Sequence, residues 1–352
     1  SIIFSIKNFL MNLYILLILA IIFIAISVII TAYIRNFSIK NNLFDIPNDR
    51  SAHKVPIPNL GGVAIIIPLI FLIVTLFSRE MISDEIGISM IIGLSLIAIV
   101  GLVDDCKNLS AFTRVTLYII ASGISLYLIG GIKSISINEY NYYLGGVGYC
   151  LGVLFLVWLT NLYNFMDGVD GFAAIETICV SIFCCFLFYS LDNFPFLIIM
   201  LCLTSTTIGF LYWNFAPAKI FMGDIGSCSI GFFFGLLAVY TGVNGIISIC
   251  VWLVLLAPFI SDATFTLVSR ILNSERWYVA HKSHAYQKLH QLGLSHKQLS
   301  LNLFIVNILL IWPLAYLANS YTKYELPIVI LSYILMAAIW LLIQVKCKEI
   351  TK

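Results

Sequence analysis

Long apolar runs separated by short polar segments are the main pattern of this 352-residue chain. A helix needs about 17 to 25 apolar residues to cross the hydrocarbon core of a bilayer. Eleven runs meet this length, near residues 12–35, 61–78, 86–103, 113–131, 146–163, 172–191, 194–213, 227–243, 245–270, 299–319 and 325–345. The longer connections cover residues 36–60, 132–145 and 271–298, which leaves no room for a soluble domain. We therefore predict an all-α integral membrane protein, a bundle of about eleven transmembrane helices that forms a single polytopic membrane domain over residues 1–352.

The composition supports this reading and narrows the classes of function. Hydrophobic residues make up 61% of the chain and charged residues only 10%, whereas an ordinary soluble domain is about 25% charged. A soluble globular domain is thereby excluded, and a net charge of +2 gives no reason to expect nucleic acid as a partner. Because a methionine, Met11, follows the start closely, we treat residues 1–10 as a segment that need not be native.

The distribution of basic residues predicts the orientation of the chain in the membrane. When the connections are assigned alternately to the two sides, fifteen Lys and Arg residues fall on one side and four on the other. Cytoplasmic loops are enriched in Lys and Arg, so the first side is predicted to be cytoplasmic. The polar segments described next all fall on that side, which predicts a polar site that faces the cytoplasm.

The first polar segment joins two acidic residues, Asp104 and Asp105, to Lys107 and Arg114. Adjacent carboxylates repel each other unless a cation lies between them or one of them is protonated. A metal ion and anionic groups could therefore share this segment, with Lys107 and Arg114 as candidate anion-binding residues. The alternative is a charged stop signal where a helix leaves the bilayer.

The second polar segment spans residues 161–171 and contains Asn161, Asn164, Asp167 and Asp170 together with two glycines. Oxygen ligands of this kind suit Mg²⁺ or Mn²⁺, which bind proteins through a few carboxylates plus substrate phosphates. The glycines would let the backbone approach a phosphate closely. A solvated turn is the alternative.

The third polar segment places Asp224 between Gly223 and Gly226, directly before a long apolar run. Backbone N–H groups at such a helix start can hold an anion. The structural alternative is that Asp224 or Ser227 simply caps the helix.

Two basic segments complete the set. Residues 281–290 carry His281 and His284 among lysines; the histidine spacing is compatible with zinc, but the lysines favour an anionic ligand. Residues 49–62 carry basic side chains that suit phosphate, or that would contact anionic lipid. The candidates in this second loop are Arg50, Ser51, His53 and Lys54.

Taken together, the five segments supply carboxylates for a divalent ion and cations for phosphates on one side of the membrane. Phosphoryl transfer requires this combination, because the protein contributes mainly positioning and charge neutralisation. The sequence therefore predicts a membrane enzyme that transfers a phosphoryl-linked group.

The same residues also resemble a known family. The order D-D-x-x-x-L-S-A-x-x-R, N-x-x-N-x-x-D-G-x-D-G, F-x-G-D-x-G-S and a late histidine segment is similar to that of the polyprenyl-phosphate N-acetylhexosamine-1-phosphate transferases (glycosyltransferase family 4). The similarity runs from about residue 35 to residue 300. The late segment, H-K-S-H-A-Y-Q, looks more like the O-antigen-initiating branch than like the peptidoglycan translocase, whose histidines are adjacent.

The resemblance implies an activity and its partners. Members of the family move a sugar-1-phosphate from a UDP-N-acetylamino sugar to undecaprenyl phosphate, release UMP and use Mg²⁺, with Mn²⁺ as an alternative ion. For this chain it implies the first lipid-linked step of a cell-surface polysaccharide, in a bacterial cytoplasmic (inner) membrane. The sequence is compatible with a homodimer. It does not identify the amino sugar that is transferred.

The resemblance also implies a role for each motif residue. Asp224 is the expected main magnesium ligand and Asn164 a second one, while Asp104 and Asp105 handle the lipid phosphate or its proton. The expected residues of the nucleotide and sugar-phosphate pocket are Asp167, Asp170, His281 and His284. Whether the lipid phosphate attacks directly or an aspartyl intermediate forms stays open.

Other classes of membrane protein are weaker readings of the same residues. A transporter is the chief alternative, because Asp262 and Glu176 within apolar runs could mark an ion path. A CDP-alcohol phosphotransferase would need D-G-x-x-A-R, but Asp170 is followed by Gly-Phe-Ala-Ala. An intramembrane metalloprotease would need H-E-x-x-H, which the sequence lacks.

Overall fold

The computed structural model describes the backbone of residues 2–47, 55–275 and 282–350, with side chains from Leu13 onward except at positions 348 and 350. The helices are α1 (Ile2–Lys40), α2 (Val63–Ser78), α3 (Asp84–Lys107), α4 (Ala111–Leu128), α5 (Gly145–Met166), α6 (Phe172–Ser190), α7 (Phe194–Asn214), α8 (Asp224–Val243), α9 (Ile249–Leu255), α10 (Ala257–Leu272), α11 (Ala285–Gln291), α12 (His296–Val306), α13 (Trp312–Ser320) and α14 (Glu325–Ile350). A π-helical turn (Asn307–Ile311) joins α12 to α13, and a 3-10 turn (Thr322–Tyr324) precedes α14. The strands are β1 (Phe44–Asp45), β2 (Ile57–Pro58), β3 (Ser134–Ile137) and β4 (Tyr140–Tyr143).

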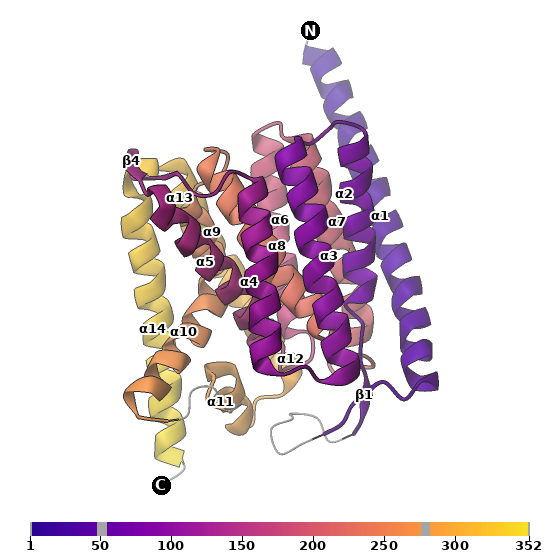
Figure 1. Ribbon diagram of the computed structural model, residues 1–352, viewed down its shortest axis with the longest axis vertical. Coiled ribbons are helices and arrows are strands. Elements are labelled where there is room, and N and C mark those ends of the chain that lie inside the picture. Colours follow the sequence, from indigo (N-terminus) through magenta and orange to yellow (C-terminus); the bar gives the residue numbers. More distant parts are fainter. Residues whose placement is uncertain (1, 48–54, 276–281, 351–352) are drawn as a thin grey trace.

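The helices form an upright bundle, as the sequence predicts for an integral membrane protein (Figure 1). Within the described residues, nine helices or helix pairs are long and apolar enough to cross a membrane, or ten if α9 and α10 count as one broken span. The remaining predicted run forms α2, an apolar helix of 16 residues. Each of the eleven predicted runs is thus helical, and the all-α membrane class is confirmed; the number of true spans stays a prediction.

One predicted run is not a single helix. Residues 245–270 were expected to cross as one span, but α9 and α10 meet at an angle of 76°. Pro258 occupies the first turn of α10, where its missing N–H and its ring prevent a continuous helix. The expectation of one straight helix here is wrong, and the break turns α10 away from the bundle axis.

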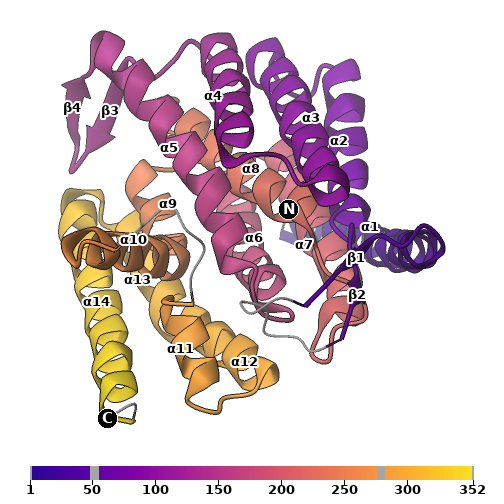
Figure 2. The same ribbon diagram turned by 60° about the horizontal axis from the view of Figure 1, so that its bottom comes forward.

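Helix α8 lies at the centre of the bundle, and its neighbours approach it unusually closely. It is almost entirely buried and packs against α2, α3 and α5 (Figure 2). A Cβ at Gly62 would lie 2.3 Å from the Gly226 Cα, and a Cβ at Gly101 would lie 2.6 Å from backbone atoms of Asp224 and Ile225. Small residues let helices approach closely in membranes, so these glycines bring α2 and α3 against the first turn of α8.

The segment that leads into α8 is also hydrogen-bonded to the segment that leads into α2. The backbone N–H of Gly61 donates to the Phe221 carbonyl at 2.8 Å, and that of Gly62 donates to the Met222 carbonyl at 2.7 Å. These bonds satisfy backbone groups that would otherwise be buried without partners. The start of α8 is therefore held in place before any functional side chain is considered.

The polar segments of the sequence gather at one end of the bundle. The ends of α3, α5 and α10 and the starts of α4, α8 and α12 meet at this end, together with α11 and the β1–β2 pair (Figures 1 and 2). The β3–β4 hairpin lies at the opposite end, within the 132–145 connection for which no strand was expected.

The close approach of α2 to α8 can be tested with a glycine substitution. Gly62→Ala is expected to cost about 1 to 3 kcal/mol of stability, because overpacking against backbone cannot be relieved by rotating a side chain. The measurement is the thermal unfolding midpoint in detergent. Gly146→Ala is the matched control, since a Cβ there meets nothing within 4 Å. Equal midpoints for the two variants would show that the contact does not matter.

Candidate active site

Four side chains from four different helices are joined by hydrogen bonds at the polar end of the bundle. Asp104 comes from the last turn of α3, Arg114 from α4, Asn164 from α5 and Asp224 from the first position of α8. Arg114 Nη1 lies 2.5 Å from Asp104 Oδ2 and 3.1 Å from Asp224 Oδ2. Asn164 Nδ2 donates to Asp224 Oδ1 at 2.6 Å. Residues that the sequence predicts for one site therefore converge in space.

Arg114 offsets the repulsion between the two carboxylates that it contacts. Asp104 is buried and also accepts a hydrogen bond from the Leu109 backbone N–H at 2.6 Å. Two carboxylates near one point favour their charged forms together only if a cation lies between them. The Arg114 guanidinium is that cation in this structure, and its side chain keeps 30% exposure toward the solvent.

Asp105 is directed into the bundle, where it caps α8. Its Oδ1 accepts from the Asp224 N–H at 2.9 Å and from Asn59 Nδ2 at 3.0 Å, and its Oδ2 accepts from the Ile225 N–H at 3.1 Å. A carboxylate is stabilising there because it satisfies unpaired N–H groups at the positive end of the helix dipole. The sequence left open whether Asp224 or Ser227 caps α8; in the structure Asp105 supplies the cap, across 119 positions of sequence.

Gly223 makes room for this cap. It adopts φ +74°, and a Cβ at this position would lie 2.6 Å from both Asn59 Oδ1 and Asp105 Oδ2. Only glycine adopts that backbone conformation without strain and leaves that space. The glycine before Asp224 therefore serves the helix cap, which in turn fixes where the Asp224 side chain begins.

Asp167 follows α5 directly and is half-buried beside the same cluster. Burial and the nearby charges of Asp224, Asp105 and Asp170 raise the pKa of Asp167 well above its ordinary value. Such mutual repulsion marks a place where a bound cation would be favourable.

The donor atoms of this cluster fit a magnesium ion bound mainly by substrate. The described residues contain no group of three His, Cys, Asp or Glu side chains arranged to hold a metal by themselves. Mg²⁺ does not need one, because it commonly takes one or two carboxylates and completes its shell with waters and phosphates. Asp224, with Asp167 near it, offers carboxylate oxygens of this type. Asn164, the second predicted ligand, turns its amide nitrogen toward Asp224, so its amide group would have to rotate to present its oxygen to an ion. The metal assignment stays a prediction.

Asp170 contacts α12 and does not join the hydrogen-bonded cluster around Asp224. Its Oδ1 lies 3.2 Å from His296 Nδ1 on α12, and its Oδ2 accepts from the Ala218 backbone N–H at 3.0 Å. Its carbonyl accepts from Ser300 Oγ at 2.8 Å. Asp170 therefore ties the 167–171 segment to α12 and to the segment before α8.

The other predicted residues take separate places. Asn161 donates to the Val157 carbonyl at 2.8 Å, within its own helix, and Lys107 is exposed at the end of α3. His284 is buried at the start of α11, 3.7 Å from Asp262 Oδ1. The predicted residues Arg50, Ser51, His53, Lys54 and His281 lie outside the described residues.

Sequence reasoning missed two polar residues of this region, Asn59 and His296. Asn59 lies within the basic segment 49–62, and His296 lies just beyond the histidine segment 281–290. Each is recognised only by its contact with an aspartate from a distant part of the chain. The nearest signal in the sequence is that Asn59 lies in a segment marked as basic and His296 lies six residues after one.

Comparison with known proteins identifies relatives of this chain. The model of the family described as glycosyl transferase family 4 matches residues 87–242. A "probable undecaprenyl-phosphate N-acetylglucosaminyl 1-phosphate transferase" of Bacillus subtilis is 31% identical over 297 residues, which cover 80% of this chain and 79% of the relative. A "decaprenyl-phosphate N-acetylglucosaminephosphotransferase" of Mycobacterium leprae is 28% identical, over 74% of this chain and 73% of the relative. A "phospho-N-acetylmuramoyl-pentapeptide-transferase" of Streptococcus agalactiae is 32% identical, over 51% of this chain and 57% of the relative.

These findings define a class of multi-span membrane transferases. The chain belongs to glycosyl transferase family 4, the polyprenyl-phosphate N-acetylhexosamine-1-phosphate transferases. The family predicted from the motifs is thereby confirmed, whereas the O-antigen-initiating branch stays a prediction.

The two neighbouring aspartates of this site should respond differently to loss of charge. Asp105→Asn is expected to lower the thermal unfolding midpoint, because an amide cannot accept all three hydrogen bonds and each one lost costs about 1 kcal/mol. Asp224→Asn is expected to lower the midpoint less than Asp105→Asn does, since removal of one carboxylate from a crowded acidic cluster offsets the weaker contact with Arg114. A loss of stability in Asp224→Asn as large as in Asp105→Asn would contradict the assigned cap.

Proposed function

We propose that this protein transfers an N-acetylated amino-sugar-1-phosphate from a UDP-sugar to undecaprenyl phosphate and releases UMP. The product would be the first lipid-linked intermediate of a cell-surface polysaccharide. The observation that carries the proposal is the convergence of Asp104, Arg114, Asn164 and Asp224 at one end of a membrane bundle. The relatives named for polyprenyl-phosphate sugar transferases support the same reaction class.

The proposed reaction is a direct displacement at phosphorus. An oxygen of the lipid phosphate forms a bond to the sugar-linked phosphorus, and the bond from that phosphorus to the UMP oxygen breaks. A phosphate monoester has a second pKa of about 6, so it is largely ionised at neutral pH. The attacking oxygen therefore needs little help from a base, and the role of Asp104 would be to hold Arg114 and the acceptor site in place.

Mg²⁺, held by Asp224 and Asn164 with Mn²⁺ as an alternative, would neutralise charge on the pyrophosphate. Arg114 already lies between two of the carboxylates, and its exposed part would face an incoming phosphate. Asp105 would act from beneath this site, because its carboxylate orients the first turn of α8 and hence Asp224.

The site would face the cytoplasm of a bacterial inner membrane. The support is the fifteen-to-four distribution of Lys and Arg between the two sides, with the polar cluster at the side richer in basic residues. The sugar nucleotide is a soluble cytoplasmic compound and the acceptor phosphate lies at the membrane surface, so both reactants would meet at this end of the bundle.

The amino sugar is the finer part of the proposal. The histidine segment H-K-S-H-A-Y-Q favours a donor of the O-antigen type, such as a UDP-N-acetylated 6-deoxyhexosamine, whereas two of the relatives are named for N-acetylglucosamine. A UMP-release assay with purified protein, undecaprenyl phosphate and a panel of UDP-N-acetylamino sugars separates these donors. Release with none of them would reject the proposed function.

The two acidic residues that suggested a transporter, Asp262 and Glu176, have structural roles. Asp262 accepts hydrogen bonds from the backbone N–H groups of Ala285 and Tyr286 and so caps α11. Glu176 accepts a hydrogen bond from Asn307 Nδ2 at 2.7 Å, at the π-helical turn. Both acidic residues therefore have partners within the protein, and the transferase relatives match most of the chain.

Loss of the Asp224 charge should abolish turnover without unfolding the protein. Asp224→Asn is expected to lower kcat by about a hundredfold or more, because electrostatic stabilisation of the transferring phosphoryl group is a large term in such reactions. UMP release at saturating Mg²⁺ is the measurement. Asp192→Asn, an exposed aspartate in the turn between α6 and α7 at the other end of the bundle, is the control. Wild-type turnover in Asp224→Asn would remove this residue from the site.

Direct displacement also predicts that no covalent phosphoryl-enzyme forms. When the protein meets a UDP-sugar labelled in its sugar-linked phosphate, without lipid acceptor, the denatured protein should carry no label. Label on an aspartate would instead establish a two-step route through that residue.

A further inference from the structure

Helix α11 is attached to the bundle by polar contacts as well as by packing. It has only seven residues and lies at the polar end, outside the spanning helices. Asp262 Oδ1 accepts from the Ala285 N–H at 2.8 Å, and Asp262 Oδ2 accepts from the Tyr286 N–H at 3.3 Å. At the other end of α11, Lys288 donates to Gln344 of α14.

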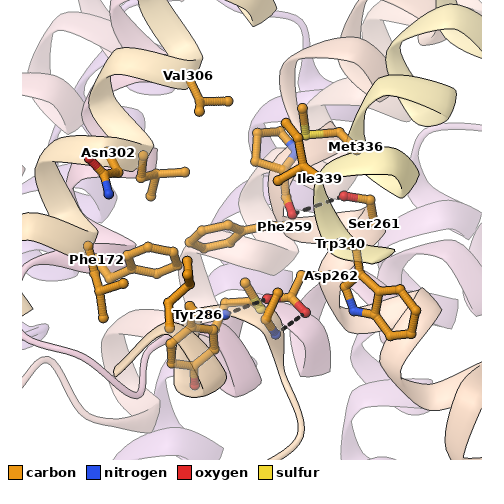
Figure 3. A pocket seen from close by; sticks show the side chains of 16 residues that line it. Phe172, Phe259, Ser261, Asp262, Tyr286, Asn302, Val306, Met336, Ile339 and Trp340 are labelled. Carbon is orange, nitrogen blue, oxygen red and sulfur yellow. Dashed lines mark hydrogen bonds between the residues drawn. The ribbon is translucent and has the colours of Figure 1, made fainter. Parts of the chain in front are cut away.

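A cavity of about 260 Å³ borders α11 on the side of α14 (Figure 3). Tyr286 and Leu289 line it from α11, and Met336 and Trp340 line it from α14. Side chains that face a cavity lack the dispersion contacts that a filled core provides. The side of α11 that borders the cavity therefore contributes less packing than a filled core would, and the polar anchors add to the contacts that fix the position of the helix.

Tyr286 is the anchor that reaches residues 161–171, the carboxylate segment that contains Asp167 and Asp170. Its side chain is buried and stacks on Phe172, with ring centroids 5.1 Å apart. Its hydroxyl donates to the Phe165 carbonyl at 2.9 Å, two residues before Asp167. Burial and the charges of Asp262 and Asp167 raise the pKa of Tyr286, so the hydroxyl keeps its proton and remains a donor.

Gly168 provides the space that this hydroxyl occupies. A Cβ at Gly168 would lie only 2.3 Å from Tyr286 Oη, and 3.3 Å from Cζ. The φ of Gly168 is outside the left-handed region, so the backbone conformation does not require glycine here. What the position requires is space, and the group that fills this space comes from α11.

We propose that Tyr286 is a positioning residue that docks the histidine segment onto the carboxylate segment, and that Gly168 leaves the space into which its hydroxyl fits. The docking holds His284 and α11 in a fixed place relative to Asp167. The inference rests on the proposed function, because it is under that function that these two segments together bind the sugar nucleotide. On this proposal, the Tyr286 hydroxyl and the space at Gly168 position the part of the sugar-nucleotide site that carries His284.

The docking predicts a specific pattern of kinetic effects. Tyr286→Phe removes only the hydroxyl and is expected to raise KM for the UDP-sugar about three- to tenfold, as for one lost hydrogen bond. KM for undecaprenyl phosphate should stay within about twofold, because Asp104 and Arg114 do not touch α11. Gly168→Ala should raise KM for the UDP-sugar more than Tyr286→Phe does, since the methyl group would push the hydroxyl and α11 outward.

The decisive variant combines the two substitutions. Tyr286→Phe removes the atom that the alanine methyl would strike, and the nearest remaining ring atom lies 3.3 Å away. The double variant should therefore return to the KM of Tyr286→Phe alone. If the effects of the two single variants multiply instead, Gly168 and Tyr286 act independently and the docking is wrong.

A readout that needs no activity separates this inference from the proposed function. Amide hydrogen exchange of Ala285–Gln291 should be faster in Gly168→Ala than in the wild type. In the double variant it should be slower than in Gly168→Ala. Absence of UMP release from the wild type with every donor would reject the function and leave this exchange test standing. Exchange that the second substitution does not restore would reject the docking even if the enzyme is active.

The folding of the variants also tests the proposed docking. If Gly168→Ala does not yield a folded protein in detergent, the double variant should fold, because its clash has been removed. Failure of the double variant, beside a folded Tyr286→Phe, would overturn the proposal.

Discussion

The buried start of α8 is the constraint on which the rest of the site depends. Its N–H groups must find acceptors inside a membrane bundle, where an unpaired buried donor costs about 1 to 3 kcal/mol. Asp105 accepts two of them and glycines let α2 and α3 close around the turn. Because Asp224 is the first residue of α8, the same contacts that satisfy the backbone also place the Asp224 carboxylate against Arg114 and Asn164. Satisfying the helix end and building the site are thus one structural problem.

Most of the fold could be predicted from the sequence, because length and apolarity suffice to define a membrane helix. Each of the eleven predicted runs is helical, and the polar segments lie at one end of the bundle, as their alternation requires. The break before Pro258 was missed although the proline is visible in the sequence. Apolarity continues through residues 245–270, so the hydrophobic pattern carried no sign of the bend.

The contacts within the site could be predicted only in part. Motif residues such as Asp104, Asn164 and Asp224 were expected to meet, and they do. What spacing could not give is which oxygen faces which donor: the Asp105–Asp224 contact spans 119 positions of sequence, and a carboxylate can serve a metal, a cation or a helix end equally well. His296 was missed for the same reason, since it is defined by its contact with Asp170 and not by any local pattern.

Two helix starts in this protein are capped by an aspartate in the same way, but the packing around them differs. Asp105 caps α8, and Asp262 caps α11, each from a neighbouring helix. Around α8 the cap is enclosed by backbone-to-backbone contacts at glycines, and displacement of any part would strain several helices. Beside α11 there is a cavity, so the cap and the Tyr286 hydroxyl hold a helix whose packing is less complete on that side. The metal-binding half predicted for the site is therefore built on the closely packed start of α8, and the half that carries His284 on a short helix that borders a cavity.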